Sequence, residues 1–260
     1  MKYFYILVNI SLLWFNPTSR AICQINIGGV PYSYLNPIKS NIPVKVMPGV
    51  DIQKLQKEDK EEEGSMVPPR FGHNFKVNFN LKNTGVWETL PNGDRIWLLS
   101  INCPDALSIN LLYDDFWIPE GSTLYIYTED KTQTLGGFTL QNNKGKKEEK
   151  RGFATGLLYS QKITLEYYEP QNVKGLGRIS IDKVIHGYRY INLKYKRNNE
   201  GSANGRFGDS DQSCMVNINC SEGADWQDEK KGVALMLING SRVCSGSLIN
   251  NTSNDGTPYF

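Results

Sequence analysis

The sequence predicts an all-β protein: an antiparallel, jelly-roll-like β-sandwich in residues 71–191, followed by the first strands of a second β-domain. Between 71 and 191, short runs rich in β-branched and aromatic residues recur with turn residues between them, and no long segment of helical periodicity interrupts them. A similar alternating pattern starts again at residue 214, after a polar break. The 260 residues, 39% of them hydrophobic, suffice for one large or two small domains with buried cores.

Residues 1–23 have the pattern of a secretory signal peptide. Lys2 supplies a positive charge, residues 3–15 are mostly apolar, and small residues at 21 and 23 occupy the positions that a signal peptidase checks. Because this apolar stretch is short and interrupted, we expect a secreted, extracellular protein with no stable membrane span after signal removal. A lipoprotein anchored at Cys23 and a plain membrane anchor are the alternatives.

Residues 24–70 are expected to form an irregular linker or pro-segment. Four prolines punctuate the segment between 31 and 48, and residues 51–63 are a run of charged side chains with few apolar ones. Such a run favours a solvated linker or a short exposed helix. A binding tail is the rival interpretation.

The sandwich is predicted from a series of strand-like runs. Phe75–Phe79 alternates apolar and polar residues, as a half-buried strand does. Turn residues at 91–94 and 119–122 separate further runs. These runs are 85–87, 95–101, 107–111, 123–127, 153–157, 162–167 and 178–182. Short strands at this spacing favour two packed antiparallel sheets.

Two segments follow the sandwich. Residues 192–213 are polar and form a flexible, exposed linker typical of a processing site; its basic residues are Lys194, Lys196, Arg197 and Arg206. Residues 232–238 and 243–249 are apolar runs on either side of Asn239-Gly240, which predicts a β-hairpin.

Few residues are candidates for chemistry. The sequence has only two histidines, His73 and His186, so a histidine metal cage or a local Ser-His-Asp set is hard to build, and no metal or cofactor is predicted. His186 is expected to be a packing residue with satisfied hydrogen bonds. Ser247 lacks the Gly-x-Ser-x-Gly elbow of a nucleophile. Asp114 and Asp115 are adjacent at a predicted strand end, so their side chains should leave opposite faces. A net charge of +2 gives no argument for binding nucleic acid.

The segment from residue 214 onward resembles the start of the mature domain of bacterial lysyl endopeptidases and their trypsin-like relatives. The resemblance depends on Ser213-Cys214, the Cys-x5-Cys spacing to Cys220, Glu222-Gly223, the run Trp226–Ala234 and the run Cys244–Thr252. Residues 71–191 resemble the β-rich pro-region often found ahead of such domains. The matching runs there are Leu90–Arg95, Leu107–Asp115 and Glu166–Pro170.

The resemblance implies that the chain is the N-terminal part of a bacterial, secreted serine endopeptidase precursor that cuts after Lys or Arg. Residues 214–260 would then be the incomplete start of a trypsin-like β-barrel. The family's catalytic triad has no counterpart here and is expected beyond Phe260, so this fragment should be inactive. Cys244 would pair with the cysteine after the catalytic His. Cys214 and Cys220 would pair with later parts of the domain, and all three partners are absent from this sequence.

The expected partners follow from the same resemblance. Protein or peptide substrates would bind the missing domain, and the sandwich would contact its own catalytic domain. The rival interpretation is a non-catalytic secreted sandwich module that binds glycan or protein through aromatic side chains, although core packing explains most of these. The aromatic candidates are Trp97, Trp117, Tyr125, Tyr127, Tyr167 and Tyr168. A stand-alone inhibitor is a third possibility.

Overall fold

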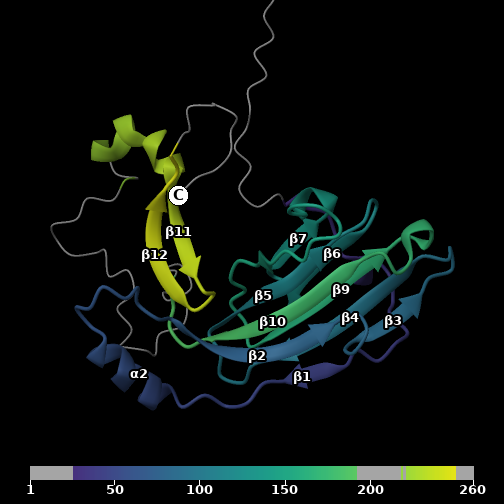
Figure 1. The fold of residues 1–260 in the computed structure, drawn as a ribbon, viewed down its shortest axis with the longest axis horizontal. Coiled ribbons are helices and arrows are strands. Elements are labelled where there is room, and N and C mark those ends of the chain that lie inside the picture. The colour runs from purple at the N-terminus through teal and green to yellow at the C-terminus, as the bar shows by residue number, and fades with distance from the viewer. Residues whose placement is uncertain (1–25, 192–217, 219–220, 250–260) are drawn as a thin grey trace, which may run out of the picture.

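The computed structural model describes residues 26–191, 218 and 221–249. It confirms an all-β fold, in which two sheets lie together and a hairpin projects from one end (Figure 1). The first sheet has six strands in the order β1-β4-β9-β6-β7, with β3 paired to β4. Its strands are β1 (Val44–Val46), β3 (Val86–Thr89), β4 (Arg95–Asn102), β6 (Thr123–Thr128), β7 (Thr134–Phe138) and β9 (Lys162–Glu169).

The second sheet has four strands in the order β2-β10-β5-β8. Its central strands are long, and they pair in antiparallel register from Arg178 opposite Trp117 to Gly187 opposite Ser108. The strands are β2 (Gly72–Asn80), β5 (Ser108–Trp117), β8 (Phe153–Ala154) and β10 (Arg178–Gly187). Short 3-10 helices occur at η1 (Leu140–Asn142), η2 (Gln171–Val173), η3 (Ser221–Trp226) and η4 (Glu229–Gly232).

The core lies between the two sheets. Side chains alternate along each strand, so every second residue of the predicted runs faces inward. Trp97 is fully buried, and its Nε1 donates to the Thr84 carbonyl at 2.7 Å. Gly85 allows this contact, because its φ is 76° and a Cβ there would lie 2.4 Å from Trp97 Nε1. Other core residues include Leu99, Ile101, Ile109, Leu111, Phe116, Leu165, Tyr167, Ile179 and Ile181.

The expectation that 24–70 is irregular is wrong in part. This segment contains α1 (Tyr32–Leu35), strand β1 and α2 (Ile52–Glu61). β1 pairs with β4 in parallel, Val44 opposite Ser100, whereas the prediction was of antiparallel sheets. Prolines flank β1, which fits its position at the sheet edge. With only three residues, β1 is too short for a period-2 pattern to reveal it in the sequence.

The charged run 51–63 forms the short helix α2, one of its two predicted structures. Asp51 caps the helix by accepting a hydrogen bond from the Lys54 backbone N–H at 3.0 Å. The helix is not fully solvated, because Leu55 is buried. No helix in the described part of the chain has the length and apolar character needed to cross a membrane.

The predicted hairpin is confirmed as β11 (Val233–Ile238) and β12 (Arg242–Ser247). Its turn uses Asn239 at φ 51° and Gly240 at φ 77°. Left-handed conformations at both central residues match the right-handed twist of hairpin strands. The two strands form a sheet of their own, and no closed barrel forms among the described residues.

Candidate functional site

The turn of the β11–β12 hairpin docks on the end of the sandwich through backbone hydrogen bonds. The Ser241 carbonyl accepts from the backbone N–H of Phe71 at 2.9 Å and of Gly72 at 3.2 Å. The Val243 N–H donates to the Pro69 carbonyl at 3.0 Å. These bonds join residues at the start of β2 to the beginning of β12, and we call this contact the docking site.

An apolar cluster lies beneath these hydrogen bonds. Phe71 and Ile185 are fully buried, and Val243 is 7% exposed between them. Gly240 belongs to the same contact, because a Cβ on it would lie 3.0 Å from Ile185 Cδ1 and 3.1 Å from Leu112 Cδ1. Burying side chains of this size gives about 1.5–3 kcal/mol each, which makes the cluster the main source of docking energy.

Two asparagines of the sandwich bind the turn itself. Asn110 of β5 is buried, and its Nδ2 donates to the Gly240 carbonyl at 3.0 Å. Asn74 of β2 donates from Nδ2 to the Asn239 carbonyl at 3.4 Å. The turn carbonyls would otherwise be left without donors at this contact, so both asparagines favour the docked position.

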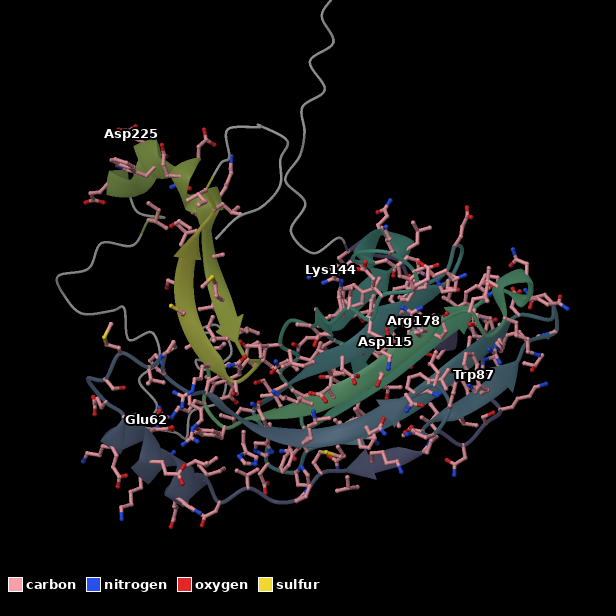
Figure 2. The ribbon with its side chains drawn as sticks, viewed as in Figure 1. Glu62, Trp87, Asp115, Lys144, Arg178 and Asp225 are labelled. Atoms are coloured by element: carbon pink, nitrogen blue, oxygen red, sulfur yellow. The ribbon has the colours of Figure 1, made fainter. Side chains whose placement is uncertain are left out.

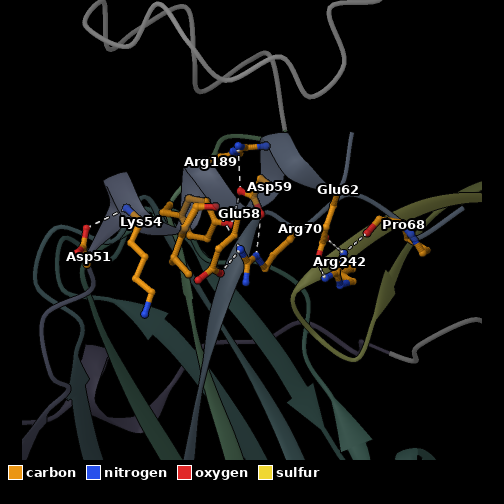
Figure 3. Close-up of polar contacts among 11 residues, drawn as sticks. Asp51, Lys54, Glu58, Asp59, Glu62, Pro68, Arg70, Arg189 and Arg242 are labelled. Atoms are coloured by element: carbon orange, nitrogen blue, oxygen red, sulfur yellow. Dashed lines mark hydrogen bonds and ion pairs between the residues drawn. The ribbon is translucent and has the colours of Figure 1, made fainter. Parts of the chain in front are cut away.

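Arg242 at the start of β12 forms a two-bonded ion pair with Glu62, which follows α2 (Figure 3). The Nη1–Oε2 distance is 2.8 Å and the Nη2–Oε1 distance is 3.1 Å. Arg242 Nη1 also donates to the Pro68 carbonyl at 2.7 Å. The hydrogen bonds from Arg242 lower the pKa of Glu62 below its ordinary value. The two parallel bonds fix the orientation of the hairpin as well as its position.

A second ion cluster fixes α2 against the sandwich (Figure 3). Its centre is Asp59, whose side chain is 5% exposed. Arg70 donates to it at 2.8 Å, Arg189 at 2.9 Å and the Tyr188 O–H at 2.7 Å. Burial would lower the pKa of Arg70, but its bonds to Glu58 and Asp59 outweigh this and raise it. Burial, and then Asp59, raises the pKa of Tyr188. Since Arg70 is next to Phe71, the cluster holds the strand that receives the hairpin.

Sequence analysis did not single out Glu62, Arg70 or Arg242. Glu62 and Arg242 are 180 residues apart, and no local pattern connects them. The sequence does carry one indication of these ion pairs. Residues 58–63 have more acidic than basic side chains, so arginines or lysines from other parts of the chain could pair with them.

Of the three cysteines that the sequence singled out as disulfide candidates, only Cys244 lies within the described residues. Cys244 is an exposed, free thiol on β12, opposite Met236. Cys103 is fully buried on the core side of the sandwich, and burial raises its pKa to about 12. The other predicted features lie outside the described residues: residues 1–23, Lys194, Lys196, Arg197, Arg206, Cys214 and Cys220.

The two histidines lie on neighbouring strands of the four-stranded sheet. His186 is opposite His73, and burial lowers the pKa of His186. The prediction that His186 is satisfied is wrong, because neither ring nitrogen has a hydrogen-bond partner within the described residues. Ser247 lies opposite Val233 on the hairpin, far along the chain from either histidine. Nothing in the described ranges arranges these groups as a Ser-His-Asp set.

The two adjacent aspartates lie within β5 and not at its end, and the pairing of β5 with β10 shifts register between Tyr113 and Asp115, so the regular alternation on which the prediction depended is interrupted there. Asp114 is exposed, whereas Asp115 is buried and accepts from Arg178 Nε at 3.0 Å. Figure 2 shows Asp115 and Arg178 together, apart from Glu62 near α2. Among the described residues, no three His, Cys, Asp or Glu side chains gather as metal ligands would.

Core packing accounts for half of the candidate aromatic platform. Trp97, Tyr127 and Tyr167 are buried. Tyr125 and Tyr168 are partly exposed and line a pocket on the six-stranded sheet. The aromatic residues therefore do not form one continuous surface.

The docking site defines a β-sandwich that holds the turn of a hairpin from a following segment. That segment is related to a known family: residues 207–260 match the family model described as "Lysyl endopeptidase, C-terminal domain". The matched stretch contains the hairpin, and the sandwich precedes it. The end of this chain is thus related to lysyl endopeptidases.

Proposed function

We propose that the chain is the leading part of the precursor of a secreted, lysyl endopeptidase-type serine peptidase that cleaves after Lys or Arg. In this proposal the sandwich is the pro-domain. The observation that carries it is the docking site, in which the sandwich holds a hairpin that belongs to the family-matched stretch. This contact supports the proposal that the sandwich is the partner of the peptidase segment.

The uncovered face of the hairpin supports this role. Leu237 and Val243 share one face with Leu235 and Val233, because paired residues of antiparallel strands point to the same side. The sandwich covers the first two, whereas Leu235 is 56% and Val233 62% exposed. A two-stranded hairpin is marginally stable alone, so these side chains need further strands above them. The remaining strands of a peptidase barrel would supply that cover.

The catalytic set would come from outside these 260 residues. The sequence holds two histidines and both are on the sandwich, so neither can serve a triad built on the hairpin's domain. In the complete enzyme a serine attacks the scissile carbonyl, a histidine takes its proton and an aspartate orients the histidine. The exposed Cys244 thiol is free to pair with a cysteine of that missing part.

The segment 192–213 would be the processing site that separates pro-domain from peptidase, and residues 1–23 would direct secretion. Cleavage there would leave the non-covalent contacts of the docking site in place, because these contacts join residues before 192 directly to residues after 213. The pro-domain would therefore remain bound after cleavage until the contact itself is lost.

Two measurements test the catalytic assignment. The purified 260-residue chain should not hydrolyse a lysine or arginine ester, and the gene should encode a His-Cys motif shortly after codon 260. Hydrolysis by the 260-residue chain above a heat-denatured blank, or the absence of that motif, would overturn the assignment.

A charge-swap series in the complete precursor tests the pro-domain role. Glu62→Arg places two cations together at the docking site and should lower the yield of active peptidase, and adding Arg242→Glu should restore it. Glu61→Arg is the matched control, because Glu61 is exposed on the same helix. If Glu62→Arg and Glu61→Arg give equal yields, the pro-domain role is wrong while the peptidase assignment stands.

A further inference from the structure

A pocket with a volume of about 500 Å³ lies on the outer face of the six-stranded sheet, between α1 and the turn at 90–92. Along β9, Leu165 and Tyr167 face the core, so Glu166 and Tyr168 face outward into this region. Tyr125 of β6 is the direct neighbour of Glu166. The main lining residues are Tyr32, Leu35, Leu90, Tyr125, Glu166 and Tyr168.

Glu166 is a buried carboxylate that forms no ion pair among the described residues. It is 1% exposed, and it accepts long hydrogen bonds of 3.3 Å from the Ser33 backbone N–H and the Tyr127 O–H. Glu169, three residues along the same strand, is also buried but is ion-paired with Arg95. No described lysine or arginine forms such a pair with Glu166. Buried charges are normally paired, so this carboxylate is prepared for a cation from outside.

The tyrosines around it favour the same kind of ligand. Aromatic faces attract cations, and a neighbouring ring shows this on the same surface, where Lys131 Nζ lies 4.7 Å from the centre of the Tyr34 ring. Asn36 and Asn92 also line the pocket and offer amide oxygens as further acceptors. The apolar side chains of Leu35 and Leu90 suit an aliphatic stem.

We propose that this pocket binds the side chain of a lysine residue from a peptide, with its ammonium group against Glu166 and its stem along the tyrosines. A slender aliphatic stem with a compact terminal charge suits a carboxylate that is covered at the base of the pocket. A neutral sugar would leave Glu166 without a counter-charge. The docking site involves the four-stranded sheet and the segment before it, so this pocket is a separate site.

The test is a titration of the full 260-residue chain, followed by NMR, with Nα-acetyl-lysine methylamide and with Nα-acetyl-norleucine methylamide, a neutral probe with a similar stem. The lysine probe should bind at least about tenfold more tightly, as expected for hydrogen bonds to a charged group. Glu166→Gln should remove that preference. Glu149→Gln should keep it, because Glu149 lies beside Arg178 of the four-stranded sheet.

Equal binding of the two probes, binding of neither, or preferential binding of a neutral monosaccharide would overturn the proposal. Should Glu166→Gln fail to fold, the comparison of the two probes on the unmodified chain still decides the question. The outcome does not depend on whether the sandwich is a pro-domain.

Discussion

Replacing Gly240 with alanine adds a single Cβ atom to the turn that the docking site holds. Gly240 has φ 77°, and an added Cβ would lie 3.0 Å from Ile185 Cδ1 and 3.1 Å from Leu112 Cδ1. The left-handed conformation costs an L-residue roughly 1–2 kcal/mol. Displacing the two packed methyl groups adds about 1 kcal/mol. The lower entropy of the undocked chain offsets roughly 0.4–1 kcal/mol of this.

The net loss of docking free energy is therefore about 1–2.6 kcal/mol, or roughly five- to eightyfold in the docking equilibrium. Hydrogen exchange of the Phe71 and Gly72 amides measures it directly, because both donate to the Ser241 carbonyl. Their exchange should accelerate by that factor in Gly240→Ala. Gly232→Ala is the matched control directly before the hairpin, since Gly232 is not left-handed and its added Cβ would meet nothing within 4 Å. Equal exchange in both variants would refute the proposed packing of the turn.

Three further predictions concern the surroundings of this site. Arg70→Met should lower the free energy of unfolding, measured in urea, by about 2–3 kcal/mol, because the buried Asp59 then loses one of its two arginine partners. Lys76→Met is the control: Lys76 forms an exposed ion pair with Asp182, and its loss should cost less than about 1 kcal/mol. The hydrogen bonds from Arg242 lower the pKa of Glu62 from its ordinary value of 4.5. The Glu62–Arg242 pair therefore stabilises docking at pH values above 4.5, and this stabilisation is lost as the pH falls through the lowered pKa. The protection factor of the Phe71 amide, which removes the pH dependence of intrinsic exchange, should therefore fall more steeply in acid in the unmodified chain than in Glu62→Gln, and parallel profiles of the two would contradict this. Iodoacetamide at pH 8 should label Cys244 well before Cys103, because Cys103 is buried and has a pKa of about 12. Mass spectrometry of the labelled peptides measures the order, and earlier labelling of Cys103 would contradict the prediction.

The strands of the sandwich were predictable where they alternate and where turns separate them. β4, β6, β9 and the hairpin follow this rule, and their turns carry the glycine or asparagine that the geometry requires. β7 was missed because Thr134–Phe138 contains two glycines and lies at a sheet edge, where period-2 burial is weak. The participation of 24–70 in the sandwich was missed for a related reason. Its contacts come from isolated side chains such as Tyr32, Ile38 and Ile42, which pack without a period.

The docking site could not be predicted because each of its interactions joins residues that are distant in sequence. Local periodicity places Val243 on an apolar strand face but does not show that Phe71 and Ile185 cover it. The same holds for Glu166. Its position on a strand was predicted, but the absence of an ion pair with any described lysine or arginine depends on the positions of all those side chains in the fold. Periodicity in the sequence indicates which face of a strand or helix is apolar, but a site depends on which strands and helices pack against each other in the fold.

Under the proposed function, the hairpin would contact the sandwich through its turn and a peptidase barrel through its remaining surface. The sandwich binds the turn, from Asn239 to Val243, and leaves the outer part of β11 and the Cys244 thiol uncovered. A barrel could therefore assemble on the exposed part while the turn remains fixed. The turn is held by a buried apolar cluster and by the two hydrogen bonds from Arg242 to Glu62, which fix the register of the hairpin. Under the proposed function, the sandwich would thereby order the first hairpin of the peptidase domain and lower the entropy that further strands would have to overcome.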